Sequence, residues 1–150
     1  MQAEAREATM SYNILVVDDS KSMRRVIRKT LEISGFRIGE YFEASNGLEA
    51  LDLLEGKWID LILSDIHMPV MDGFGFIRSL RERDICSDTP VVFVTTEANE
   101  DRLNDLMELG ASGYIRKPFR PEEILALLSR VLGETDDGGK MGTGTEGCDF

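Results

Sequence analysis

The sequence predicts an α/β fold with a parallel sheet, because segments of strand character alternate five times with segments of helical periodicity between residues 12 and 133. Three of the strand segments are apolar throughout, as expected of central strands that are covered on both faces. Gly35 and Gly110 follow two of the apolar stripes, at points where a helix commonly stops. Ligands of open α/β sheets bind beyond the carboxyl ends of the strands, so we expect the functional site there.

The first two strand–helix units lie within residues 14–56. Residues 14–17 (ILVV) are a continuous apolar run, and the helix that follows has apolar residues at helical spacing. Residues 36–44 (FRIGEYFEA) form a more polar strand, followed by a helix over residues 46–56. We expect both apolar stripes to pack in the core: Met23, Val26, Ile27 and Leu31 in the first helix, and Leu48, Leu51 and Leu54 in the second.

The remaining strands are predicted over residues 59–63, 91–96 (VVFVTT) and 113–117 (GYIRK). A helix follows each of them. Asp72 is the expected N-cap of the first of these helices, Gly73 eases the bend into it, and Pro121 opens the last one. The stripes expected in the core are Phe76, Ile77 and Leu80, then Leu103, Leu106 and Met107, then Ile124, Leu127, Leu128 and Val131.

Composition excludes several classes of protein. The chain has 150 residues, of which 42% are hydrophobic and 30% charged, as is ordinary for one soluble globular domain. A net charge of -11 with no basic stripe argues against nucleic-acid binding. Cys86 and Cys148 make neither a disulfide framework nor a zinc set, which favours the reducing cytoplasm. No apolar run is long enough to insert into a membrane, and the N-terminal residues lack a secretion signal.

Both ends of the chain differ from the middle. We expect residues 1–11 to be flexible, residues 12–133 to fold, and residues 134–150, rich in Gly, Thr and acids, to be disordered. Gly142, Gly144 and Gly147 match the dinucleotide fingerprint G-x-G-x-x-G. That motif binds nucleotides only between a strand and a helix, and neither flank is predicted here.

Chemically active side chains follow four of the predicted strands. Asp18 and Asp19 end the first strand and Asp65 ends the third, while Thr95 and Lys117 come at the ends of the fourth and fifth. Each residue alone has an ordinary explanation, such as a helix cap, a turn or a solvated charge. Because carboxyl ends of parallel strands share one edge of the sheet, we expect all of them to converge there.

Three carboxylates in one cleft repel one another. One pair at about 4 Å costs roughly 4 kcal/mol at an effective dielectric near 20. Either some of the carboxyls take up protons or a cation lies among them. An oxygen-only ligand set favours Mg²⁺, or Mn²⁺ in its place, and leaves positions open for phosphate oxygens. A carboxylate beside such a metal can attack phosphorus and form an aspartyl-phosphate, and a lysine and a hydroxyl can stabilise the phosphoryl group.

Four stretches, ILVVDDS, LILSDIHMPVMDG, VVFVTTEA and GASGYIRKPF, resemble the signature stretches of response-regulator receiver domains. The resemblance covers roughly residues 12 to 133 and is specific, because all four stretches occur in order at the family's spacing. It implies a doubly wound, flavodoxin-like sheet of five parallel strands in the order 2-1-3-4-5 with five helices.

The resemblance also implies the metal and phosphoryl residues. Asp65 matches the phosphoacceptor. Asp19 would bind Mg²⁺ directly, and Asp18 mainly through water. His67 lies where the family offers a backbone carbonyl to the metal, so its side chain is not implicated.

Further matches concern the response to phosphorylation. Thr95 matches the switch hydroxyl, Lys117 the lysine that pairs with the phosphoryl group, and Tyr114 the aromatic whose rotamer reports activation. The bond between Lys117 and Pro118 is usually cis in this family.

The function implied is that of a stand-alone phospho-switch rather than an enzyme. A histidine kinase or histidine phosphotransfer protein would supply the phosphoryl group from a phosphohistidine. Only about 17 residues follow Gly133, too few for an output domain. Output is therefore expected through docking of another protein to the fourth helix, the fifth strand and the last helix.

Two alternatives stay open. A metal-dependent phosphatase could also form an aspartyl-phosphate, although haloacid-dehalogenase-like enzymes use an Asp-x-Asp pair and the acids here are adjacent. A receiver-like scaffold without phosphoryl chemistry is weakened because every chemically active residue is present.

Overall fold

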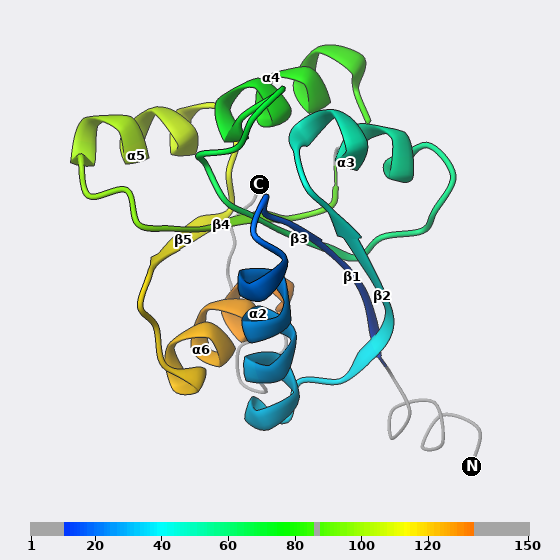
Figure 1. Cartoon of the computed structure of the whole chain (residues 1–150), viewed down its shortest axis with the longest axis vertical. Coiled ribbons are helices and arrows are strands. Elements are labelled where there is room, and N and C mark those ends of the chain that lie inside the picture. Colours follow the sequence, from blue (N-terminus) through cyan, green and yellow to red (C-terminus); the bar gives the residue numbers. More distant parts are fainter. Residues whose placement is uncertain (1–10, 86–87, 134–150) are drawn as a thin grey trace.

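The structure is a computed structural model, and it describes residues 11–85 and 88–133. These residues form five strands that alternate with five helices (Figure 1). The segments expected to be flexible (residues 1–11) or disordered (residues 134–150) lie outside the described residues, apart from Ser11. Both cysteines and the glycine fingerprint also lie outside them. The strands are β1 (Tyr12–Val17), β2 (Ile38–Ala44), β3 (Leu61–Ser64), β4 (Val91–Thr95) and β5 (Gly113–Arg116). The helices are α2 (Lys21–Ser34), α3 (Gly47–Leu54), α4 (Gly73–Arg83), α5 (Glu100–Glu108) and α6 (Pro121–Leu132).

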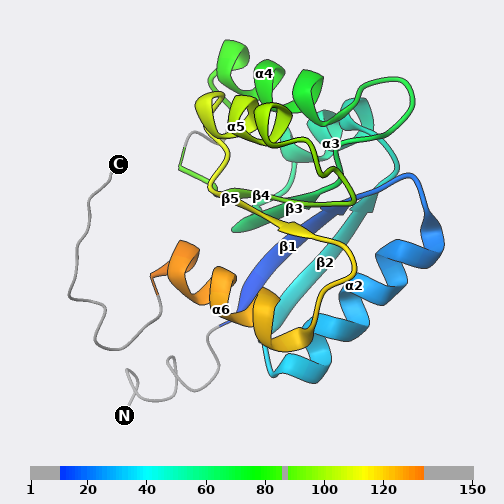
Figure 2. The same cartoon turned by 90° about the vertical axis from the view of Figure 1, so that its left-hand side faces the viewer.

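The strands form one parallel sheet in the order β2-β1-β3-β4-β5. Helices α2 and α6 cover one face, and α3, α4 and α5 cover the other (Figures 1 and 2). Two separate apolar cores result, one on each side of the sheet. The predicted doubly wound, flavodoxin-like fold is therefore confirmed. Within the described ranges, no helix is long and apolar enough to cross a membrane.

Local signals place the helix ends where the sequence predicts them. The Asp72 side chain caps α4 by accepting a hydrogen bond from the Gly75 amide at 2.9 Å. Gly35 ends α2 with a left-handed φ of 88°, which is a conformation that glycine adopts without steric cost. Pro121 is the first residue of α6, where its missing N–H costs nothing. The peptide bond between Lys117 and Pro118 is cis, as the resemblance implies.

Three residues expected in the core are exposed instead. Leu48 is 45% exposed, Val26 48% and Met107 39%. Each of the three lies at the edge of the apolar stripe of its helix. On α3, Leu48 is rotated by about 100° about the helix axis from Gly47, at the margin of the buried face. The buried residues of α3 are Gly47, Ala50, Leu51 and Leu54. A narrow stripe suffices because each helix contacts only one face of the sheet.

Candidate functional site

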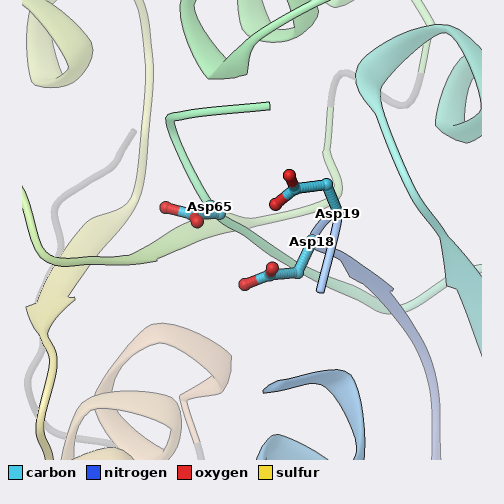
Figure 3. Close-up of side chains that lie close together, drawn as sticks. All are labelled: Asp18, Asp19 and Asp65. Atoms are coloured by element: carbon cyan, nitrogen blue, oxygen red, sulfur yellow. The ribbon is translucent and has the colours of Figure 1, made fainter. Parts of the chain in front are cut away.

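The three predicted acids converge at the carboxyl edge of the sheet (Figure 3). Asp18 and Asp19 follow β1 and Asp65 follows β3, and these two strands are direct neighbours in which Val17 pairs with Ser64. One carboxylate oxygen from each acid lies within 4.8 Å of the others. Asp18 is only 1% exposed, whereas Asp19 is exposed, so the cluster is buried at one end and reaches solvent at the other.

Lys117 brings a positive charge into the acid cluster from the end of β5. Its Nζ lies 3.0 Å from Asp18 Oδ2 and 3.3 Å from Asp65 Oδ2. The lysine side chain is only 11% exposed, so solvent screens these ion pairs weakly. The ammonium offsets part of the repulsion between two acids that come from different strands.

Asp18 is the member of the cluster whose charge is disfavoured by its surroundings. Burial raises the pKa of its carboxyl above the usual range, and the nearby Asp65 charge acts in the same direction. The Ser20 amide, 2.9 Å from Asp18 Oδ1, and the Lys117 ammonium oppose this rise in pKa. Because a raised pKa means that the charged carboxylate is disfavoured, a further cation among the acids would stabilise the folded chain.

Asp65 is held by donors on both carboxylate oxygens. Oδ1 accepts a hydrogen bond from the Ile66 amide at 2.6 Å, and Oδ2 faces the Lys117 ammonium. The Asp65 backbone amide donates to the Val17 carbonyl at 2.8 Å, which extends the pairing of β3 with β1. The side chain is 12% exposed and is therefore oriented yet still reachable. This arrangement can present one oxygen to an electrophile while the charge stays compensated.

Thr95 ends β4, the strand beside β3, and it is fully buried. Its hydroxyl oxygen accepts a hydrogen bond from the Glu97 amide at 3.1 Å. Tyr114 lies on β5 opposite Phe93 of β4 and is 37% exposed. The hydroxyl is thus at the edge where the acids converge, and the tyrosine ring is accessible from solvent.

His67 does not join the acid cluster through its side chain. Its ring is 53% exposed, and Nε2 lies 3.1 Å from Glu97 Oε1. The same Glu97 oxygen pairs with Arg102 Nε at 3.2 Å. The Asn99 amide, which donates to the other Glu97 oxygen, is the main reason that the pKa of Glu97 is lowered.

Glu97 was missed by the sequence reasoning. Its carboxylate connects the loop after β3 to the start of α5, because it contacts both His67 and Arg102. Its position two residues after the strand end at Thr95 is the signal that could have found it.

Gly73 was expected only to allow the bend into α4, but the structure also leaves no room for a side chain at this position. A Cβ on this residue would lie 2.8 Å from the Ile66 Cα and 2.9 Å from the Asp65 carbonyl oxygen. The Gly73 amide also donates to the Ile66 carbonyl at 2.7 Å. The start of α4 therefore packs directly against the backbone that carries Asp65.

We expect Gly73→Ala to lower the free energy of unfolding by about 1–3 kcal/mol, because the methyl group meets backbone atoms that cannot rotate away. Chemical denaturation measures the effect. Gly56→Ala is the matched control, since nothing lies within 4 Å of a Cβ at that position. An equal change in both variants would contradict the close approach at Gly73.

Comparisons with known proteins agree with this geometry. Residues 14–129 match the family described as response regulator receiver domain. A chemotaxis protein CheY homolog from Campylobacter jejuni is 36% identical over 121 residues, which make up 80% of this chain and 92% of that protein. A probable transcriptional regulator, ycf29 of Porphyra purpurea, is 36% identical over 124 residues, or 82% of this chain and 57% of that protein. The chain spans about half the length of the transcriptional regulators that it matches.

Solved structures show the same similarity. The chemotaxis response regulator CheY4 of Vibrio cholerae has 37% sequence identity and a TM-score of 0.72, with 82% of this chain and 100% of that chain covered. The receiver domain of a Pseudomonas aeruginosa sensor histidine kinase has 27% identity and a TM-score of 0.71, with 83% and 99% covered, and it holds magnesium in its active-site cleft. The phosphatase alternative is thereby set aside. The chain belongs to the response regulator receiver domain family, whose members are phospho-accepting signalling switches rather than classical enzymes.

Proposed function

We propose that this chain accepts a phosphoryl group on Asp65 from a phosphohistidine of a histidine kinase or a histidine phosphotransfer protein. The observation that carries the proposal is the Lys117 ammonium, which contacts carboxylates from two different strands at the edge of the sheet. A structural ion pair needs only one carboxylate. Here the ammonium is shared by two oriented carboxylates, and a third acid lies beside them. Such a site suits the transfer of an anionic group, because the cation can stabilise the negative charge of that group.

In the proposed reaction, an oxygen of Asp65 attacks the phosphorus of the donor. The new P–O bond forms as the P–N bond to the donor imidazole breaks, and the imidazole leaves with the electron pair and is neutralised by a proton. Lys117, now 3.3 Å from Asp65 Oδ2, would pair with the oxygens of the transferred group. The amide–Oδ1 hydrogen bond from Ile66 fixes the other carboxylate oxygen and so aims the attacking one.

Magnesium fits this donor set, which consists of hard oxygen ligands with an uncompensated negative charge. Asp18, Asp19, Asp65 and the backbone carbonyl of His67 would hold the ion, and Mn²⁺ could replace it. Bound there, the metal would neutralise charge on the phosphoryl oxygens. The magnesium in the cleft of the related Pseudomonas receiver domain supports this assignment.

We further propose that Thr95 and Tyr114 form the switch. A phosphoryl group on Asp65 adds acceptor oxygens that a buried hydroxyl on the neighbouring strand can reach by a small movement. The space that Thr95 leaves would then be filled by the Tyr114 ring, which is 37% exposed before the change. A local change in charge would in this way alter the surface of β5.

Output would occur by docking of another protein to the surface formed by α5, β5 and α6. A hollow of about 630 Å³ lies between β5 and α6, lined by Tyr114, Arg116, Ala126 and Arg130 among others. We propose that residues 12–133 act as a stand-alone receiver, in the manner of the Campylobacter relative, of which 92% is covered. The tail over residues 134–150 would then be dispensable for phosphorylation. Receiver domains are typically cytoplasmic, and we propose the same compartment here.

The switch is tested with the phosphoryl mimic beryllofluoride and Mg²⁺. We expect amide resonances to shift along α5 and β5 as well as in the cleft, because the Thr95 movement is coupled to Tyr114. Thr95→Ala should still accept phosphate but should lose the shifts on β5, whereas Thr96→Ala, at the exposed neighbouring residue, should retain them. Normal shifts in Thr95→Ala would show that the coupling does not depend on this hydroxyl.

A further inference from the structure

Trp58 is the only tryptophan of the chain, and 77% of it is exposed. It precedes β3 at the amino edge of the sheet, whereas Asp65 follows β3 at the carboxyl edge. Large aromatic side chains usually bury most of their surface, so a ring with this exposure is available for contact with a partner. None of the proposed phosphoryl chemistry uses it.

Hydrogen bonds hold Trp58 in one position despite its exposure. The indole Nε1–H donates to Asp60 Oδ1 at 2.9 Å, and the Trp58 carbonyl accepts from the Asn13 side-chain amide at 3.0 Å. Asp60 is fixed in turn, because its other oxygen accepts from the Asn13 backbone amide at 2.8 Å. A ring held in place in this way loses little conformational entropy when a partner binds.

Trp58 lines a hollow of about 570 Å³, which we name the Trp58 hollow. Its wall includes Lys57, Trp58, Asp60, Asp84 and Asp88. Asp84 and Asp88 are exposed, and within residues 11–85 and 88–133 neither of their carboxylates forms a salt bridge. The ammonium of Lys57 lies 5.5 Å from the centre of the Phe42 ring. The hollow therefore joins a fixed aromatic face to two free carboxylates.

We propose that the Trp58 hollow binds an arginine-bearing segment of a partner protein. A guanidinium group stacks on an indole face through cation–π attraction and donates paired hydrogen bonds to carboxylates. Arginine suits both contacts better than lysine because its guanidinium is planar and weakly hydrated. The net charge of -11 favours the approach of a basic segment and opposes that of nucleic acid. Because the hollow and Asp65 lie at opposite edges of the sheet, both can be engaged at once.

Trp58 itself reports on the hollow, since any intrinsic tryptophan fluorescence of the full chain comes from this ring. We would titrate the chain with the peptide acetyl-Arg-Gly-Arg-amide and, for comparison, with acetyl-Glu-Gly-Glu-amide. A saturable change in emission is expected with the basic peptide alone. The apparent affinity should fall as salt is added, because the contacts involve charges.

Two double variants separate a specific site from general attraction to an acidic protein. Asp84→Asn with Asp88→Asn should weaken binding about tenfold, since both carboxylates lose their charge. Asn is suited to position 84, where φ is 55°, because it tolerates the left-handed conformation. Asp105→Asn with Glu108→Gln makes the same change in charge on α5, outside the wall of the hollow, and should leave binding within about twofold of the parent.

The proposal is overturned if the basic peptide gives no saturable signal, if both double variants weaken binding equally, or if Asp84→Asn with Asp88→Asn binds as well as the parent. An emission change that depends on protein concentration without peptide would identify a second copy as the occupant and would also overturn it. Calorimetric titration of Trp58→Ala supplies a readout that does not depend on the fluorophore. Unchanged peptide affinity in that variant would exclude a role for the ring.

Discussion

Replacing Asp65 by asparagine is expected to abolish incorporation of phosphate from a phosphohistidine donor. The amide oxygen is a poor nucleophile, and the charge that Lys117 compensates is lost. The measurement is transfer of acid-stable, hydroxylamine-labile label from a phosphorylated histidine phosphotransfer domain in the presence of Mg²⁺. The loss should be complete rather than partial, because Asp18, which is also held by Lys117 and by a backbone amide, is only 1% exposed, whereas the Asp65 side chain is 12% exposed and can be reached by a donor.

Asp52→Asn is the matched control, since Asp52 is exposed on α3 and lies outside the cluster. It should take up label at the parent rate. Label in Asp65→Asn at the parent rate would place the nucleophile elsewhere. Failure of the parent chain to take up label from any donor would favour the alternative of a scaffold without phosphoryl chemistry.

Magnesium is expected to raise the melting temperature of the parent chain, because the ion binds the folded acid cluster and not the unfolded chain. At a hundredfold excess over the dissociation constant, the gain in free energy of unfolding is about 2.7 kcal/mol. Burial raises the pKa of the Asp18 carboxyl, so its charged form is disfavoured and a cation beside it would stabilise that form. Melting curves with and without Mg²⁺ measure the effect.

Asp19→Ala should remove this rise in melting temperature, because it removes one of the three carboxylates of the proposed metal site. Asp19 is exposed, so its replacement should not disturb the core. Asp52→Ala should keep it. A midpoint that does not change in the parent at saturating metal would argue against the assignment of the acids to a metal. This result would not affect the membership of the receiver-domain family, because the membership rests on the fold and on the matching sequence.

The sequence was most informative where local chemistry and chain direction act together. Alternation of strands and helices implies parallel pairing, and parallel pairing brings the carboxyl ends of the strands to one edge of the sheet. The convergence of Asp18, Asp19 and Asp65 could therefore be predicted from the sequence. The caps at Asp72 and Gly35 could be predicted because each depends on one side chain or on its absence. The strand order rested on the family resemblance, since periodicity says nothing about which strands are neighbours.

Features that depend on three-dimensional packing could not be predicted. Leu48 has the same spacing from Leu51 as a core residue would have, and only the position of α3 over the sheet decides that it faces solvent. The contact of Glu97 with His67 joins loops 30 residues apart. Trp58 would ordinarily be assigned to a core, and its exposure became evident only from the structure.

The hydrogen bond from the Glu97 amide to the Thr95 hydroxyl bears on how often the unphosphorylated chain resembles the active one. A neutral hydrogen bond of this kind contributes about 1 kcal/mol, which is about a fivefold bias in an equilibrium between two conformers. In the proposed switch, moving Thr95 toward Asp65 would give up this bond before a phosphoryl oxygen replaces it. The resting population of this proposed switch would therefore be favoured by a contact within one loop, and at position 97 only a proline substitution would remove the backbone amide that makes it.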